Sequence, residues 1–229
     1  MTEHIVKSFD DELQGLAGSV AEMGGMAEDL VEQSVQALLR SNTDLAQTVI
    51  AADRDVNAMQ HDIEERAILT IARRQPMAQD LREIIAAIRI SSDLERVADL
   101  AKNISRRTLA TESDQFTAKL LVGVEHLAHL GLRQLNNVLN SYGSRNVELA
   151  REVWEADDEI DAVYTSLFRE LLTYMMEDPR NISMCTHLLF CAKNIERIGD
   201  HATNIAETVH YLVTGNPLED FRRQPNAEA

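Results

Sequence analysis

Apolar residues recur every three or four positions along most of this 229-residue chain, which is the period of an amphipathic helix. The first such stripe runs from Phe9 to about Arg40, and we expect the glycine pair at 24–25 to be its weak point. A second stripe ends near Pro76, because proline disrupts the interior of a helix. A third stripe covers about residues 77–109, and the polar segment that follows it is expected to be a linker.

The second half of the chain repeats this order of elements. It is expected to contain a fourth helix from residue 116, a turn at 141–146, a fifth helix that Pro179 ends, and a sixth helix over about 181–213. The sequence therefore predicts an all-α fold of six long helices in two pseudo-symmetric three-helix bundles. The predicted units are a first bundle at 1–109, a second bundle at 110–215 and a polar C-terminal tail at 216–229.

Two segments that lie 101 residues apart indicate an internal duplication. Residues 93–104 have the sequence DLERVADLAKNI and residues 194–205 have NIERIGDHATNI, which are identical at six of twelve positions. Pro76 and Pro179 each precede the last helix of a triplet, in agreement with this alignment. The duplication indicates that the two bundles share one internal plan.

The duplicated segment places carboxylates close to the apolar direction of its helix. With Ile88 as the zero of a projection at 100° per residue, Glu95 falls at about −20° and Asp99 at about +20°. Glu196 and Asp200 take the same two angles in the second half. Carboxylates four residues apart on a helix lie about 6 Å from each other and repel. Because burying them without a partner is costly, some positive charge is expected to compensate them.

Three kinds of compensation fit this pattern. Arg96 and Arg197, or basic residues of other helices, would form ion pairs with the acids. A hard cation would bind Glu95, Asp99 and Asn103 together with side chains of the preceding helix, since oxygen donors favour Fe, Mn, Mg or Ca over structural Zn. The third alternative is that all these acids lie in solvent. The side chains of the preceding helices that would turn toward a cation are Asp53, Asn57, Asp157 and Asp161.

The charge of the chain narrows the classes of function. Acidic side chains outnumber basic ones by 38 to 22, and the formal net charge is −16. This excess excludes binding of nucleic acid by the chain alone, because phosphate contacts need clustered Lys and Arg. Aromatic residues make up only 4% of the chain, which disfavours an all-β fold. The longest apolar runs have about five residues, whereas a membrane-spanning helix needs roughly 20, so no such helix or export signal is expected.

The remaining candidates for chemistry are weak. His201 projects away from the core and is expected to be exposed. Cys185 and Cys191 are six residues apart on one predicted helix, so they cannot bridge and are expected to be free buried thiols. The sequence contains no glycine-rich phosphate loop, no Gly-x-Ser-x-Gly elbow and no His-Glu-x-x-His zinc motif. We therefore expect no enzyme activity.

The duplicated motif resembles the twice-repeated Glu/Asp-x-x-x-Asp signature of the PhoU family. The matching residues are Glu-Arg-Val-Ala-Asp at 95–99 and Glu-Arg-Ile-Gly-Asp-His-Ala-Thr-Asn-Ile at 196–205. The similarity extends over about residues 3–215 and includes the regions of Asp53 and Asp157. Two copies of the motif, one in each half, make the resemblance specific.

The resemblance implies a regulatory function. Members of the family are cytoplasmic, often homodimeric, and repress the phosphate-starvation response and phosphate uptake. They are thought to act as adaptors between the ATPase of the phosphate ABC transporter and a membrane sensor histidine kinase. A chain of this family would reach the membrane only through these partners.

The resemblance also implies metal binding in some members, with iron or another divalent metal (Mn, Mg, Zn or Ca) at two acidic sites. The ligands carried over from the motif are Glu95, Asp99, Asn103, Glu196, Asp200 and Asn204, with Asp53, Asp157 and Asp161 as additions from the preceding helices. Asn57 stands where the second half has Asp161, so the two sites are expected to differ in affinity or metal count. Near so many acids we expect no direct phosphate site without a bridging metal, because an anion would be repelled.

Two other classes of function stay open at the level of the sequence. One is a metal-dependent enzyme with a carboxylate-bridged centre, which the clustered acids suggest although a nucleophile and histidine ligands are lacking. The other is a metal-free helical scaffold. The metal content of the purified protein distinguishes these classes.

Overall fold

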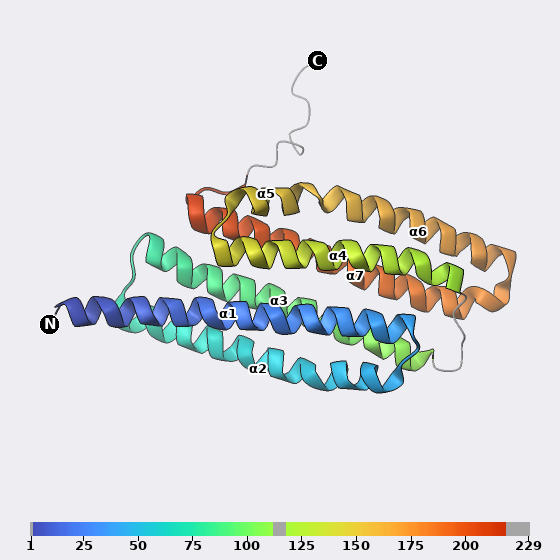
Figure 1. Cartoon of the computed structure of the whole chain (residues 1–229), viewed down its shortest axis with the longest axis horizontal. Helices are drawn as coiled ribbons and strands as arrows, with labels where there is room; N and C mark the ends of the chain where they lie inside the picture. Colours follow the sequence, from blue (N-terminus) through green and yellow to red (C-terminus); the bar gives the residue numbers. More distant parts are fainter. Residues whose placement is uncertain (1, 112–117, 219–229) are drawn as a thin grey trace, which may run out of the picture.

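Capping residues and prolines set the ends of the helices in the computed structural model, which describes residues 2–111 and 118–218. Within these residues all regular structure is helical and comprises seven α-helices and one 3₁₀ turn (Figure 1). In chain order they are α1 (Thr2–Leu39), α2 (Thr43–Arg74), α3 (Gln79–Ala110), α4 (Ala118–Ser144), α5 (Val147–Glu155), α6 (Asp157–Glu177), the 3₁₀ turn η1 (Pro179–Asn181) and α7 (Ile182–Thr214).

The same N-cap begins the second helix of each half. Asn42 precedes α2 and its side-chain oxygen accepts a hydrogen bond from the Leu45 N–H at 3.0 Å. Asn146 precedes α5 and accepts from the Leu149 N–H at 3.1 Å. Asparagine is favoured at this position because it satisfies a backbone donor that has no partner within the helix. The duplication seen in the sequence therefore extends to the turns.

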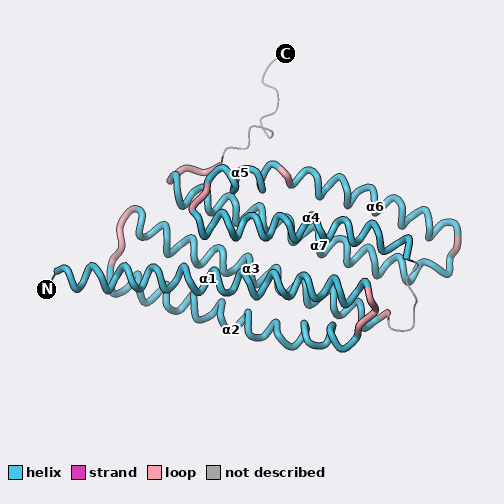
Figure 2. Tube along the Cα trace, in the orientation of Figure 1, coloured by secondary structure: helices cyan, strands magenta, loops and turns pink. Residues whose placement is uncertain are grey.

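The two halves lie side by side and share one core. Helices α1, α2 and α3 pack together in the first half, while α4, α5 and α6 pack around α7 in the second (Figures 1 and 2). Helix α3 lies against α7 and α1 lies against α4, so the apolar residues of both halves form one continuous cluster. The predicted class, two pseudo-symmetric three-helix bundles of long helices, is confirmed.

The expected fifth helix contains a break that periodicity did not predict. Ala156 separates α5 from α6 and has φ −79° and ψ −4°. Three acids, Asp157, Asp158 and Glu159, form the first turn of α6, where negative charge interacts favourably with the helix dipole. The two pieces follow one another along the same side of the bundle, so the six-helix layout is kept (Figure 1). The break places Asp157 at a helix start.

The glycine pair of the first helix is not a weak point, because α1 continues through it. Gly24 is buried where α1 meets α4, and a Cβ atom there would lie 2.5 Å from Leu139 Cδ2. A Cβ atom at Gly25 would have no neighbour within 4 Å. Gly24 therefore lets the two bundles approach closely.

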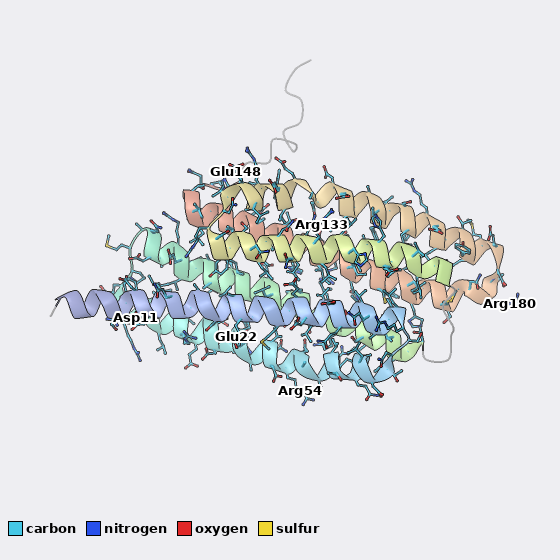
Figure 3. All side chains as sticks on the ribbon, in the orientation of Figure 1. Asp11, Glu22, Arg54, Arg133, Glu148 and Arg180 are labelled. Carbon is cyan, nitrogen blue, oxygen red and sulfur yellow. The ribbon has the colours of Figure 1, made fainter. Side chains whose placement is uncertain are left out.

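Aliphatic side chains form the core, while charged side chains project outward from the helices (Figure 3). Fully buried examples are Met23, Leu94 and Leu188, which come from both halves. Cys185 and Cys191 are buried and free, as predicted. Within residues 2–111 and 118–218, no helix combines the length and the apolar character that crossing a membrane requires.

Candidate functional site

Lys102 of α3 joins two of the predicted metal ligands in the first half. Its ammonium Nζ donates to Oδ2 of Asp53 on α2 at 2.7 Å and also bonds Asp99, which lies one turn earlier on α3. Burial works to lower the pKa of Lys102, but the hydrogen bonds to Asp53 and Asp99 outweigh burial and the pKa is raised. Lys102 therefore bonds one oxygen of Asp53, a residue that is only 4% exposed, while the other oxygen, Oδ1, has no hydrogen-bond partner among the described residues.

The other two predicted ligands of the first half make separate contacts. Glu95 Oε2 lies 3.4 Å from Nε of its neighbour Arg96. Asn103 Oδ1 accepts a hydrogen bond of 3.3 Å from Arg106 Nη1. These contacts turn both side chains toward arginines, and neither bonds the group formed by Asp53 and Lys102.

Glu196 is the most buried predicted ligand on α7, and it is 8% exposed. Its Oε1 accepts a hydrogen bond of 2.5 Å from Lys193 Nζ, whereas its Oε2 is buried and has no hydrogen-bond partner among the described residues. Burial raises the pKa of Glu196; Lys193 opposes this effect, and the negative charges of Asp200 and Asp161 add to it. Lys193 thus compensates the negative charge of the Glu196 carboxylate only in part.

Asp157 lies beside this group at the start of α6. Its Oδ1 accepts a hydrogen bond of 3.2 Å from Thr203 Oγ1 on α7. Burial raises the pKa of Asp157; the Thr203 hydrogen bond opposes this effect, and the charges of Asp161 and Asp200 add to it. Carboxylates of α6 and α7 therefore repel one another in the second half.

The two lysines occupy different positions in the repeat. With the offset of 101 residues, Lys102 corresponds to Thr203, and Lys193 corresponds to Ser92. Each lysine lies three residues from the acid that it binds, but one follows its acid and the other precedes it. Neither lysine is part of the identity between the two copies of the motif, because each is absent from the other copy. The i, i+3 spacing of acid and lysine was the signal that could have identified them.

The fit of a metal ion differs between the halves. Among the described residues, no three His, Cys, Asp or Glu side chains are grouped so that they could hold a metal ion. In the first half the Lys102 ammonium lies between Asp53 and Asp99, in the place that a cation would take, so these residues do not fit a metal in this arrangement. Each half has one buried carboxylate oxygen without a hydrogen-bond partner among the described residues, Asp53 Oδ1 in the first and Glu196 Oε2 in the second, and a hard cation would accept either as a donor. The halves therefore differ in their lysines, because Lys102 bonds two acids and Lys193 bonds one.

His201 lies at the contact between α3 and α7 and is not exposed to solvent as expected. This side chain is 16% exposed, and its Nδ1 lies 2.9 Å from Asp93 Oδ1 on α3. Asn204, a predicted metal ligand, also donates to Asp93 Oδ1, at 3.4 Å. The expectation of an exposed His201 was wrong because the face of α7 that points away from its own bundle packs against the other bundle.

The chain matches known sequences over nearly its full length. The model of the PhoU domain matches twice, at residues 20–108 and 124–209. A phosphate-specific transport system accessory protein PhoU homolog from Rhizobium meliloti (strain 1021) is 59% identical over 212 residues, which are 93% of this chain and 90% of that protein. The phosphate-specific transport system accessory protein PhoU of Escherichia coli (strain K12) is 37% identical over 222 residues, which are 97% of this chain and 90% of that protein.

Solved structures agree with this similarity. The crystal structure of PhoU from Pseudomonas aeruginosa is 38% identical and matches with a TM-score of 0.88 over 91% of this chain and 100% of that chain. The phosphate transport system regulatory protein PhoU from Streptococcus pneumoniae is 27% identical, with a TM-score of 0.85 over 92% of this chain and 99% of that chain. By the duplicated motif, both halves of the fold and these matches, the chain belongs to the PhoU domain family.

Proposed function

We propose that this chain is an accessory and regulatory protein of phosphate uptake, which represses the phosphate-starvation response when phosphate is sufficient. The observation that carries the proposal is the match of both halves to the PhoU domain, together with two relatives, 59% and 37% identical, that are named phosphate-specific transport system accessory proteins.

We propose that the chain acts in the cytoplasm as an adaptor between the ATPase of a phosphate ABC transporter and a membrane sensor histidine kinase. Two similar but unequal bundles offer two different surfaces on one continuous core, which suits a protein with two partners. To control the kinase, the chain must bind two conformations of a partner with different affinity, since equal affinity shifts no equilibrium. The proposed adaptor is a homodimer, whose mass is twice the 25.7 kDa mass of one chain.

The outer face of α6 is the surface that we propose for contact with the transporter ATPase. Phe168, Leu172 and Met176 are spaced by four residues along this helix and are 39%, 37% and 77% exposed. Apolar side chains at this spacing form one stripe, and such stripes are typical of surfaces that receive a partner helix. The ring of Tyr164 extends the stripe, with its centroid 6.4 Å from that of Phe168.

Co-purification of the transporter ATPase with the chain tests this surface. We expect the wild-type chain to retain the ATPase and the variant Met176→Glu to lose most of it, because a charge would be buried at the contact. Val122→Glu is the matched control, since Val122 is also an exposed apolar residue, at 62%, but lies on α4. Equal retention by both variants would exclude α6 as the contact surface, and failure of the wild-type chain to bind would remove the adaptor role.

We further propose that a hard divalent cation, such as iron or manganese, binds to the second half in preference to the first. Glu196 and Asp53 each have a buried oxygen without a hydrogen-bond partner among the described residues, but Lys193 beside Glu196 is 46% exposed, so this lysine can move aside into solvent. Lys102 is only 15% exposed and bonds two acids, so it competes more strongly with a metal. The proposed ligands are Glu196, Asp200 and Asn204 with Asp157 and Asp161, while Glu95, Asp99, Asn103 and Asp53 form the weaker set.

Elemental analysis of protein purified without an affinity tag tests the metal proposal. We expect Glu196→Ala with Asp200→Ala to lose the bound metal, and the matched pair Glu95→Ala with Asp99→Ala to keep it. Metal of every kind below stoichiometric amounts in the wild-type chain would favour the metal-free scaffold instead.

A further inference from the structure

A cavity with basic walls opens between the C-terminal part of α3 and α7. Its volume is about 430 Å³, which lies within the range of roughly 300–1,000 Å³ that is usual for small-molecule sites. The residues that line it are Asn103, Arg106, Arg107, Ala110, Phe190 and Asn194. None of them is acidic, although the chain as a whole carries a net charge of −16.

Among the described residues, the two arginines of the cavity keep hydrogen-bond donors that have no protein partner. Arg106 uses Nη1 to donate to Asn103 Oδ1 at 3.3 Å. The guanidinium carbon of Arg107 lies 4.2 Å from the centroid of the Phe190 ring, which holds the group by a cation–π contact. In the part of the chain that the structure describes, neither guanidinium forms an ion pair with a carboxylate. Guanidinium groups with free N–H donors are well suited to phosphate oxygens.

The internal repeat shows that this positive charge is specific to one end of the α3–α7 contact. With the offset of 101 residues, Asn103 and Asn194 correspond to Asn204 and Asp93. The latter two bond each other at 3.4 Å at the opposite end, and Asp93 also bonds His201. The two ends are therefore equivalent positions in the pseudo-symmetric fold, but one contains an acid and the other contains a neutral amide.

At the positions of the two arginines, too, the cavity end is more positive than the equivalent end of the fold. Arg106 corresponds to Glu207, and Arg107 corresponds to Thr208. The exchanges at Arg106, Arg107 and Asn194 make the cavity end more positive than its counterpart, whereas Phe190 corresponds to Arg89 and so lowers the positive charge at one position. The equivalent end of the fold forms with an acid at the position of Arg106, so the helix contact does not itself require arginine there. The packing of α3 against α7 therefore does not require the charge of Arg106, whereas Arg107 also packs on Phe190 of α7.

We infer that this cavity binds the phosphate group of a small molecule, with Arg106 and Arg107 as the anion-binding residues. The amides of Asn103 and Asn194 supply further hydrogen bonds, and Phe190, which is 48% exposed, supplies an apolar surface beside the anion. The ligand is either free inorganic phosphate or a phosphorylated compound the size of a nucleotide. Asp99 lies one helical turn from Asn103, and its negative charge is compensated by Lys102.

Isothermal titration calorimetry of the full chain with inorganic phosphate, AMP and ATP in separate titrations tests this inference. We expect at least one probe to bind the wild-type chain, and Arg106→Gln with Arg107→Gln to weaken binding by at least about tenfold for each arginine. Binding of inorganic phosphate identifies the free ion as the ligand, and binding of AMP or ATP alone identifies a phosphorylated compound. Absence of binding by all three probes would overturn the inference.

Two further variants show whether weaker binding comes from the cavity itself or only from unfolding or a loss of positive charge. Arg133→Gln with Arg151→Gln removes the same charge from exposed arginines that pair with Glu159 and Glu155, and we expect less than about a twofold change in affinity. Arg133 lies on α4 (Figure 3), whereas the residues that line the cavity lie on α3 and α7. Asn194→Asp restores the acid found at the equivalent position, and we expect it to weaken binding at least about tenfold without unfolding the chain. Equal effects of the control pair and the cavity pair, or no effect of Asn194→Asp, would refute the assignment of the cavity.

Discussion

Lys102 on α3 and Asp53 on α2 form an ion pair between residues that are 49 positions apart, with 2.7 Å between Nζ and Oδ2. Their side chains are 15% and 5% exposed, and the same ammonium also bonds Asp99. The pair fixes α2 to α3 at the level of the repeated motif. It also places an internal cation where the family resemblance led us to expect a metal ion.

Removal of the Lys102 ammonium should destabilise the fold, because it leaves the Asp53 carboxylate buried and unpaired. We expect Lys102→Met to lower the free energy of unfolding by about 3 kcal/mol, measured by urea denaturation. Lys193→Met is the matched control: that lysine is 46% exposed, so the loss should stay below about 1 kcal/mol. Equal losses in the two variants would contradict the structural role of the Lys102–Asp53 pair.

The same variant should gain a response to metal ions. Without the ammonium, the oxygens of Asp53 and Asp99 become available to a hard cation such as Mn²⁺. We expect Mn²⁺ to raise the melting temperature of Lys102→Met more than that of the wild-type chain, because a ligand stabilises the folded state that binds it. The added Asp53→Asn change should remove this gain. Identical shifts in the wild-type chain and the variant would show that Lys102 does not exclude a metal.

The adjacent glycines of α1 should respond differently to alanine. Gly25→Ala should stabilise the chain by about 0.5–1 kcal/mol, because alanine favours the helix and meets no neighbour within 4 Å. Gly24→Ala brings a Cβ atom to 2.5 Å from Leu139 Cδ2, so Leu139 must move and the gain should be cancelled or reversed. Urea denaturation of both variants measures the difference, and equal stability would mean that the α1–α4 contact is looser than described.

The ion pair between α1 and α2 should make stability depend on pH. Arg74 donates to Glu12 through Nη2 at 2.6 Å and Nε at 3.1 Å, and this holds the pKa of Glu12 below its ordinary value of 4.5. A lowered pKa in the folded state adds stability above pH 4.5, and this stability is lost as the pH falls through the folded pKa. Glu12→Gln should therefore lower the melting temperature at pH 7 and approach the wild-type value at pH 3. A difference in melting temperature between the variant and the wild-type chain that grows as the pH falls would contradict this prediction.

The fold could be predicted from the sequence because helix period and proline positions are local properties. The period shows which face of a helix is apolar, but it does not show which helix that face meets. For this reason the contact of His201 with Asp93 and the close approach at Gly24 were missed. The break at Ala156 was missed because no proline or glycine marks it.

The sequence predicted the acidic residues of the candidate site but not the two lysines that bond them. The comparison of the two halves selects residues that they share, and Glu95, Asp99, Glu196 and Asp200 were found in this way. Each half compensates its acids with a lysine that the other half lacks, so the comparison could not reveal either one. The same divergence produces the basic cavity at one end of the α3–α7 contact.

Expression of alkaline phosphatase in a strain that lacks this chain tests the proposed regulation most directly. In phosphate-rich medium, the proposal predicts high expression in the deletion strain and low expression once the wild-type chain is restored. Low expression in the deletion strain under the same conditions would contradict a repressing role in the phosphate-starvation response.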